Sequence, residues 1–399
     1  MSAPLLALLL GTIVVQPAGP VRTLTEALAL ARPGDRIVVR AGSYREPRLL
    51  VDRPLEIVGE GGPVFLGGEH STLEITADGV LLRGLVFSGV VPSSLEDRAA
   101  ILVNGAARCR IEDNRVSGAF FGIYLKGVTG CRVAGNRVSG RAGGRSSTGN
   151  GIQLWRSREV ELEDNQVEGQ RDGIYFEFVT HATVRGNTVS GNQRYGLHFM
   201  RSDSCLYERN SFLANGAGVA VMYSRAVRMI ANRFERNWGP AAYGLLLKEI
   251  SDGEVRDNRF VRNTVALYLD DANRNRISGN RFEANGWAVK LLANASDNRF
   301  EANEFAGNSF DVATNSRSTS SVFRENWWDH YQGYDLDRDG FGDVPFRPVR
   351  LFALVVEQSN PALLLLRSAF VDLLDGAERL LPILTPEALV DPRPRMRPR

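Results

Sequence analysis

The feature that most constrains this 399-residue chain is an asparagine that returns about every 22 residues. Two residues after each of these asparagines comes Val or Phe, and in the last unit Trp. The steps between them are 22, 29, 22, 23, 22, 26, 22, 23 and 23 residues, for the series Asn114, Asn136, Asn165, Asn187, Asn210, Asn232, Asn258, Asn280, Asn303 and Asn326. The two long steps contain polar or Gly/Pro insertions at 141–147 and 238–242, which belong on loops.

A unit of this length with three short strands predicts one coil of a parallel β-helix. It is too short for a propeller blade of roughly 40 residues and lacks the leucine pattern of leucine-rich repeats. Strands in successive coils would pair about 4.8 Å apart. Asn tolerates the left-handed corner conformation, and its amide can bond the Asn of the next coil. We therefore predict an all-β, right-handed parallel β-helix with a C-terminal α-helical extension, in which these asparagines form corners and bind no ligand.

The chain divides into five expected parts. Residues 1–20 contain the apolar run Leu5 to Val15, which fits either a secretory signal or a buried N-terminal segment. A capping helix follows in 21–34, centred on Thr25 to Ala31 and ended by Pro33-Gly34. The β-helix should occupy 35–328, an Asp-rich capping loop 329–350, and an amphipathic helical tail 351–399.

Composition narrows the class of partner. Lys and Arg number 48 and Asp and Glu 46, so nothing favours a nucleic-acid binder. The chain has no run of about eighteen apolar residues, the length an ordinary membrane-spanning helix needs. The three cysteines cannot complete a disulfide framework, and each precedes a repeat Asn by five residues, so we expect buried small apolar side chains at Cys109, Cys131 and Cys205.

One outer strand face has an unusual set of ligands. Alternation along a strand turns Leu197 and Phe199 inward, and His198 and Met200 outward. Alignment of the strand glycines then places Met222 over Met200. Thioether and imidazole groups at this spacing suit Cu(I) and poorly suit Mg²⁺ or Ca²⁺. We predict a transient copper site at His198, Met200 and Met222; a covering loop, or contact with a partner protein without metal, is the alternative.

The same alignment predicts which residues lie next to this face. Tyr175 and Glu177 should lie in the coil before, Tyr223 beside Met222, and Lys248 in the coil after. These four residues are candidates for partner docking. His70, His181 and His330 have no comparable neighbours and are expected to be surface histidines.

The loop after the β-helix has a pattern found in calcium sites. Asp335, Asp337 and Asp339 alternate and are followed by Gly340, as in the first half of an EF-hand-type loop, with Asp343 at the ninth position. The terminal bidentate Glu is missing. The alternatives are a structural Ca²⁺ site and an Asp/Gly turn without metal.

The tail is apolar on a broad face. We expect a helix from Asn360-Pro361 to about Leu381, whose charges forbid a bilayer span. Such a face must pack on the end of the β-helix, on a membrane surface or on a partner, through Leu363, Leu366, Phe370, Leu373 and Leu374. Residues 391–399 are Pro/Arg-rich and expected to be extended.

These segments together resemble a known family, the NosD-type maturation proteins of nitrous oxide reductase. The resemblance rests on Gly-Leu-His-Phe-Met (196–200), Val-Met-Tyr-Ser (221–224), Tyr-Gly-Leu-Leu-Leu-Lys (243–248), Gly333-Tyr334-Asp335 through Val344-Pro345, and Leu384-Thr385-Pro386-Glu387. It implies a periplasmic, non-enzymatic β-helix attached to the inner membrane through the permease of an ABC-type transporter. It also implies a copper chaperone and nitrous oxide reductase as partners, a copper hand-over role for the His/Met face, and docking of the tail helix on the membrane subunit.

The competing interpretation is a carbohydrate-active β-helix: a lyase, hydrolase or epimerase. Such enzymes need clustered carboxylates or a proton-abstracting base in a groove. Asp270-Asp271 is the one adjacent acidic pair at a strand end, with Arg274 and Arg276 nearby. Sequential residues of a strand point to opposite faces, so only one of the two acids could serve a given site.

Overall fold

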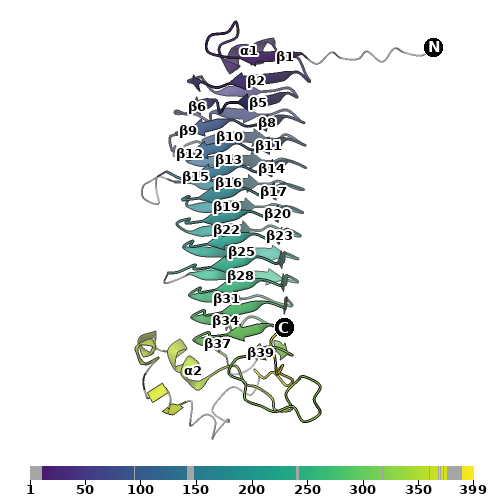
Figure 1. The fold of residues 1–399 in the computed structure, drawn as a ribbon, viewed down its shortest axis with the longest axis vertical. Coiled ribbons are helices and arrows are strands. Elements are labelled where there is room, and N and C mark those ends of the chain that lie inside the picture. Colours follow the sequence, from purple (N-terminus) through teal and green to yellow (C-terminus); the bar gives the residue numbers. More distant parts are fainter. Residues whose placement is uncertain are drawn as a thin grey trace, which may run out of the picture. The chain divides into compact units, whose positions relative to one another are not determined.

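The computed structural model describes residues 11–93, 95–141, 148–239, 242–316, 319–358, 360–366, 368, 370–371, 373–374 and 389–399. The chain forms two compact units, Met1–Tyr175 and Phe176–Arg399. In each unit the backbone winds as a right-handed parallel β-helix, in which three short strands per coil stack into three parallel sheets (Figure 1). The predicted fold class is confirmed.

The N-terminal unit begins with β1 (Thr12–Val15) and the helix α1 (Leu24–Leu30). Its first sheet continues with β2 (Arg36–Arg40), β5 (Glu56–Glu60), β8 (Leu81–Arg83), β11 (Arg110–Glu112), β14 (Arg132–Ala134) and β17 (Glu161–Glu163). The second sheet contains β3 (Ser43–Tyr44), β6 (Val64–Leu66), β9 (Val86–Ser88), β12 (Arg115–Ser117), β15 (Arg137–Ser139) and β18 (Gln166–Glu168). The third contains β4 (Leu49–Val51), β7 (Leu73–Ile75), β10 (Ala99–Asn104), β13 (Phe121–Lys126) and β16 (Asn150–Trp155), and β19 (Asp172–Glu177) spans the unit boundary.

The C-terminal unit repeats the same three-strand coil. Its first sheet contains β20 (Thr183–Arg185), β23 (Leu206–Glu208), β26 (Arg228–Ile230), β29 (Glu254–Arg256), β32 (Arg276–Ser278), β35 (Arg299–Glu301) and β38 (Val322–Arg324). The second contains β21 (Thr188–Ser190), β24 (Ser211–Leu213), β27 (Arg233–Glu235), β30 (Arg259–Val261), β33 (Arg281–Glu283), β36 (Glu304–Ala306) and β39 (Trp327–Trp328). The third, called sheet C below, contains β22 (Tyr195–Met200), β25 (Ala217–Arg225), β28 (Tyr243–Ser251), β31 (Val265–Asp270), β34 (Trp287–Leu291) and β37 (Phe310–Thr314).

The repeat asparagines form buried ladders, as predicted. From Asn187 to Asn326, each side-chain N–H donates to the amide oxygen of the Asn one coil on, at 2.9–3.0 Å. Asn114, Asn136 and Asn165 do the same in the N-terminal unit. A second ladder runs from Asn192 to Asn308. Because each amide both donates and accepts, these polar groups can be buried without losing their hydrogen bonds.

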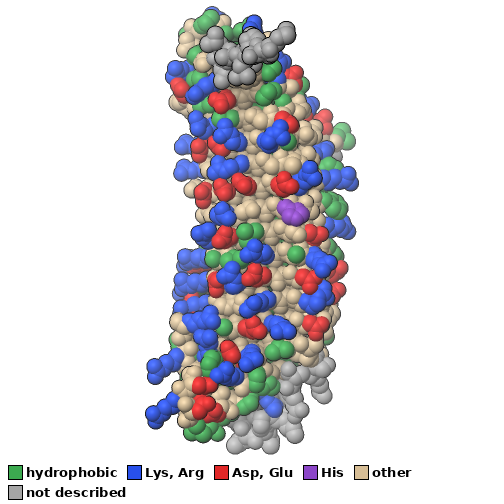
Figure 2. Space-filling view, turned by 90° about the vertical axis from the view of Figure 1, so that its right-hand side faces the viewer, with side chains coloured by type: hydrophobic (Ala, Val, Ile, Leu, Met, Phe, Trp, Pro, Cys, Tyr) green, Lys and Arg blue, Asp and Glu red, His purple; other side chains and the backbone are tan. Residues whose placement is uncertain are grey.

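Aromatic stacking fills the interior of the C-terminal unit. The rings of Phe212, Phe234, Phe260, Phe282, Phe305 and Trp328 stack in one column, with centroids 4.1–5.5 Å apart. Cys109, Cys131 and Cys205 are buried and free, as expected. Burial raises the pKa of Cys205 to about 12, so that thiol stays protonated at neutral pH. On the outside, arginines and acids intermingle across the face shown in Figure 2.

The N-terminal apolar run contributes a strand. Thr12–Val15 forms β1 and pairs in parallel with Arg36–Val39 of β2, while residues 1–10 lie outside the described residues. The expected capping helix is present as α1. Thr23 caps it by accepting the N–H of Glu26, and the Glu46 carboxylate accepts the N–H groups of Leu24 and Thr25.

The tail differs from the expected single helix. An α-helix, α2, spans Leu351–Gln358, before the predicted start, and Asn360–Leu365 forms a 3-10 helix, η1. The prediction of an α-helix beginning at Asn360-Pro361 was wrong for its first turns, which are 3-10 helical. Residues 375–388, which contain the predicted end near Leu381, lie outside the described residues. Phe352, Ala353 and Val356 of α2 pack on Phe310 of the last coil. Among the described residues, no helix has the length and apolar character needed to cross a bilayer.

The last residues are ordered by contacts with the β-helix. Asp391 pairs with Phe346 in an antiparallel bridge, and Arg395 bridges to Trp327. Asp391 is fully buried and accepts hydrogen bonds from Asn326 and from the Trp328 indole. This segment of the tail therefore terminates the asparagine ladder, a role that its Pro/Arg-rich composition did not reveal.

Candidate functional site

The two methionines of the predicted copper site are register partners. Met200 in β22 lies opposite Met222 in β25, and Met222 lies opposite Lys248 in β28. Phe199 and Val221, next to them in the chain, are fully buried inside the coils, whereas both methionines are partly exposed. Strand alternation therefore places both thioethers on the outer face of sheet C, on neighbouring strands.

His198 is on the same face but is covered. It is two residues from Met200 in β22 and opposite Ala220. Only 6% of its surface is exposed, so the expectation of a solvent-facing imidazole was wrong. Its Nδ1 lies 3.4 Å from Arg194 Nη2, and its ring centroid lies 4.7 Å from that of Tyr195. The alternation of side chains along a strand predicts the face on which a residue lies. It does not predict which neighbouring side chains cover that residue.

Charged residues flank the methionine pair along the strand-to-strand direction. The Phe178 N–H donates to the Met200 carbonyl at 3.1 Å, and the Arg201 N–H donates to the Met222 carbonyl at 3.1 Å. Phe178 follows Glu177 as Arg201 follows Met200, so the two strand pairs have the same register. By that equivalence Glu177 lies opposite Met200, as predicted. On the other side, Lys248 Nζ is 3.6 Å from the Asp270 carboxylate, which gives the lysine an opposite charge nearby. Tyr175, the last residue of the N-terminal unit, is partly buried.

An aromatic and arginine column lies at the corner beside this face. Phe178 and Tyr223 are 40% and 39% exposed, and the Arg201 guanidinium carbon lies 5.6 Å from each ring centroid. All three have left-handed backbone angles, with φ of 55°, 55° and 48°. Tyr223 was predicted to dock a partner and stays a prediction, while Phe178 and Arg201, which were not singled out, lie in the same column. The register identifies them, because each follows Glu177 or Met200 as Tyr223 follows Met222.

The Asp-rich loop brings together three of its four candidate ligands. Carboxylate oxygens of Asp335, Asp337 and Asp339 lie within 4.8 Å of one another. Asp343 instead accepts the Leu336 N–H at 2.7 Å. Arg393 Nη2 lies 2.5 Å from the Asp339 carboxylate and lowers the pKa of that carboxyl. A guanidinium in this contact opposes binding of a second cation, and the calcium site stays a prediction.

The tail residues predicted to dock divide into two groups. Leu363, Leu366 and Leu374 pack against the cluster that joins α2 to the last coil. Phe370 and Leu373 are 49% and 71% exposed, and Leu364, which was not singled out, is 90% exposed. The first group packs within the fold, and among the described tail residues the second group exposes more apolar surface.

Two other places complete the description of the surface. His181 is exposed and His70 partly buried, but His330 lies beside Asp311 and Asp329, whose hydrogen bonds raise the pKa of His330 to about 9. The expectation of an isolated surface histidine was wrong there.

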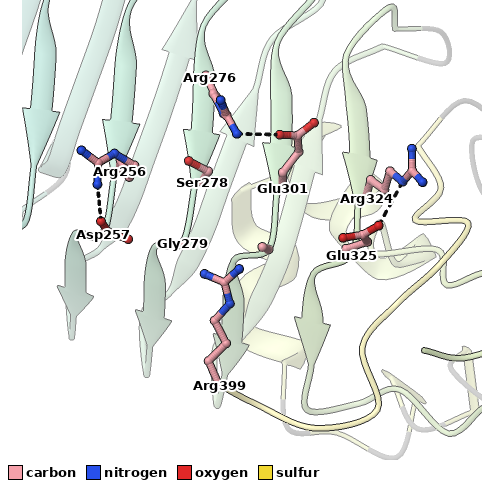
Figure 3. A pocket seen from close by; sticks show the side chains of 10 residues that line it. Arg256, Asp257, Arg276, Ser278, Gly279, Glu301, Arg324, Glu325 and Arg399 are labelled. Atoms are coloured by element: carbon pink, nitrogen blue, oxygen red, sulfur yellow. Dashed lines mark hydrogen bonds and ion pairs between the residues drawn. The ribbon is translucent and has the colours of Figure 1, made fainter. Parts of the chain in front are cut away.

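A hollow of about 450 Å³ lies along the first sheet. Its lining includes Arg256, Arg276 and Arg324, which pair with Glu or Asp side chains, namely Asp257, Glu301 and Glu325, and Arg399 reaches in (Figure 3). The six other charged side chains named here are held in three ion pairs.

The fold and this face define a class of protein. It is a right-handed parallel β-helix with a pair of partly exposed methionines on one outer strand face. The family model described as "Periplasmic copper-binding protein (NosD)" matches residues 135–334, and one for a right-handed β-helix region matches 75–177. The chain belongs to the NosD family.

Two curated relatives support this assignment. A "Probable ABC transporter binding protein NosD" of Pseudomonas aeruginosa is 31% identical, with 99% of this chain and 95% of that protein covered. Its counterpart in Stutzerimonas stutzeri is 29% identical, covering 90% and 86%. Among solved structures, the catalytic unit of an α-1,3-glucanase from Streptomyces thermodiastaticus has a TM-score of 0.64 at 15% identity, covering 84% of this chain and 70% of that one. The A-module of a mannuronan C-5 epimerase of Azotobacter vinelandii scores 0.55 at 12% identity, covering 77% and 94%. These two likenesses concern the fold alone.

Proposed function

We propose that this chain is a non-enzymatic periplasmic accessory protein of an ABC-type transporter complex, attached to the inner membrane through the permease. In this role it receives copper from a chaperone and passes it on for maturation of the metal centres of nitrous oxide reductase. The description of the family as copper-binding and the names of its relatives support the general role. Copper is the ion being transferred, so its ligands must be able to release it as readily as they bind it.

The observation that carries the proposal is the in-register pair Met200 and Met222 on an exposed strand face. Two thioethers on neighbouring strands offer soft ligands for Cu(I), while no surrounding cage slows release. His198 lies on the same face and would complete the set once Arg194 and the Tyr195 ring move away from it. Binding should therefore be weakest in the resting state and strengthen when a partner displaces this cover.

The enzyme alternative receives less support from the strand-end acids. Asp270 is bound by Lys248 at 3.6 Å and by the Asn294 side chain at 2.9 Å. Asp271 is exposed at a corner, with φ of 51°. The two carboxylates thus have different surroundings: a lysine and an amide hold Asp270, and Asp271 lies at an exposed corner. An acid and a base that act on one bond must instead face one position.

The copper proposal is tested by Cu(I) affinity under anaerobic, reducing conditions, measured by competition with a chromophoric chelator. Loss of both thioethers in Met200→Ala/Met222→Ala should weaken binding by at least about tenfold, equivalent to about 1.4 kcal/mol. Met396→Ala is the matched control, because Met396 is also partly exposed but lies in the C-terminal segment. Equal affinity of wild type and double variant would remove copper from this face and leave a docking surface.

The docking part of the proposal concerns the exposed apolar residues of the tail. Leu364, Phe370 and Leu373 present apolar surface to solvent in the isolated chain, which favours burial against a membrane subunit. Phe370→Ser/Leu373→Ser should abolish copurification with the permease while leaving the unfolding midpoint unchanged. Leu50→Ser is a control, since Leu50 is 48% exposed in β4 of the N-terminal unit. Retention of the complex by the double variant would place the docking surface elsewhere.

A further inference from the structure

A second cluster of metal-ligating groups lies at the last coil of the C-terminal unit. Asp311 belongs to β37, and Asp329 and His330 directly follow β39. One ligand atom of each lies within 4.8 Å of the other two. His330 Nδ1 is 2.5 Å from Asp329 Oδ1 and 3.7 Å from Asp311 Oδ2. This cluster shares no residue with the methionine face or with the other acidic cluster, Asp335, Asp337 and Asp339.

Asp311 takes a position that excludes large side chains in the earlier coils. The register of sheet C makes it equivalent to Gly196, Gly218, Gly244, Ala266 and Ala288. A Cβ at Gly244 would lie 2.7 Å from the Ala266 carbonyl oxygen of the next coil. In the described part of the chain β37 is the final strand of sheet C, so no following coil restricts Asp311. The carboxylate is thus specific to this coil.

Both carboxylates are oriented by bonds from outside the cluster. Asp311 Oδ1 accepts from the Asn308 side chain at 3.3 Å, at the end of the second asparagine ladder. Asp329 Oδ2 accepts the Gly307 N–H at 2.5 Å. Each acid therefore directs its other oxygen to His330 Nδ1. Asp311 has a side-chain exposure of only 4% and His330 one of 44%, so the cluster is fixed at its base and open on one side.

We propose that Asp311, Asp329 and His330 bind a divalent transition-metal ion, with Zn²⁺ as the representative cation. Two carboxylate oxygens and one imidazole nitrogen are a donor set for Zn²⁺ or Cu²⁺, and three protein ligands leave the fourth, open side for water. Ligand atoms bound tetrahedrally at about 2.1 Å lie roughly 3.4 Å apart. The 3.7 Å distance between His330 Nδ1 and Asp311 Oδ2 is close to this spacing. His330 is half-exposed, so its ring has room to move away from Asp329.

The charge around the cluster is compatible with this ion. Two carboxylates face the site, and the Arg350 guanidinium is the cation whose field reaches both Asp329 and His330. Without metal the two acids hold a proton on His330, and the ion must displace this proton into solvent. The neutral imidazole, the two carboxylates and Arg350 then sum to about one negative charge, and a divalent cation changes that sum to about one positive charge. The bound ion would connect β37 to the segment that leaves β39, and so fasten the last coil to the C-terminal segment.

The test is a Zn²⁺ titration of the full chain, stripped with a chelator beforehand, by competition with a chromophoric indicator. The wild type should bind one Zn²⁺, and His330→Gln should weaken binding at least tenfold. His181→Gln is the matched control at an exposed corner histidine, and Met200→Ala/Met222→Ala should also bind like the wild type. At the same Zn²⁺ concentration, the unfolding temperature of the wild type should rise more than that of His330→Gln.

Equal Zn²⁺ affinity of wild type and His330→Gln would overturn the proposal, as would X-ray absorption that finds sulfur among the ligands. Asp329→Asn provides a second variant, which removes a ligand charge at a partly exposed side chain. The outcome is independent of the copper proposal, because the methionine variants and the His330 variants are scored with different metals.

Discussion

The coils of the C-terminal unit and the segment that ends it satisfy the same buried groups in different ways. Within the coils, each ladder asparagine bonds to an identical residue one coil on, such as Asn258 to Asn280 at 3.0 Å. At Asn326 the repeat stops, and its partner is the Asp391 carboxylate, 65 residues further along the chain. That carboxylate accepts from the Glu325 and Asn326 backbone, the Asn326 amide and the Trp328 indole.

The difference shows that a stack of identical coils cannot supply hydrogen-bond acceptors for its own last coil. An interior coil needs only copies of itself, because its neighbours present complementary amides on both sides. The terminal coil has donors on one side and no next coil to receive them. A charged acceptor can take several N–H groups at once, and hydrogen bonds to charged groups contribute about 1.5–3 kcal/mol each.

Replacing the terminal acceptor should have the largest effect. Asp391→Ala leaves several buried donors without an acceptor and should lower the free energy of unfolding of the C-terminal unit by about 4 kcal/mol. Urea denaturation followed by Trp fluorescence measures this, since Trp328 is one of the donors. Asp391→Asn keeps one accepting oxygen and should lose about half as much. If the alanine variant unfolds with the wild-type midpoint, the tail does not stabilise the last coil.

Removing an interior amide should cost somewhat less. Asn258→Ala deletes bonds to Asn232, Asn280 and the Met229 carbonyl, all buried, and should lower the free energy of unfolding by about 3 kcal/mol. Asn294→Ala is the control, because Asn294 is an exposed asparagine outside the ladder. The denaturation midpoint of the two variants separates a ladder contribution from a general effect of losing an amide. Similar midpoints would mean that water replaces the ladder bonds.

The same contrast explains how far the sequence could be used for prediction. The period of the asparagines sets the register, and the register places Met222 opposite Met200, so the ligand pair followed from spacing. The burial of His198 depends on Arg194 and Tyr195, whose side-chain directions no repeat specifies. Asp391 and Asp329 come from the non-repeating end of the chain, and Asp311 occupies a repeat position that is small in the earlier coils of this unit. The side chains they contact lie far away in sequence, or lie where no further coil follows. The period of the repeat therefore does not predict these contacts.

The smallest effect is expected where coils are joined by surface charges. The Asp252 carboxylate bridges Arg225 at 2.9 Å and Arg274 at 2.8 Å, from the coils on either side. Arg274 lowers the pKa of Asp252, so the contribution is present above the ordinary value of 3.8 and is lost as pH falls toward the folded-state pKa. Because the Asp252 side chain is still 31% exposed and salt screens its charge, Asp252→Asn should shift the urea midpoint little at pH 7 and not at all at high salt. A shift as large as that of Asn258→Ala would show that the outer charges stabilise the stack as much as the buried ladder does.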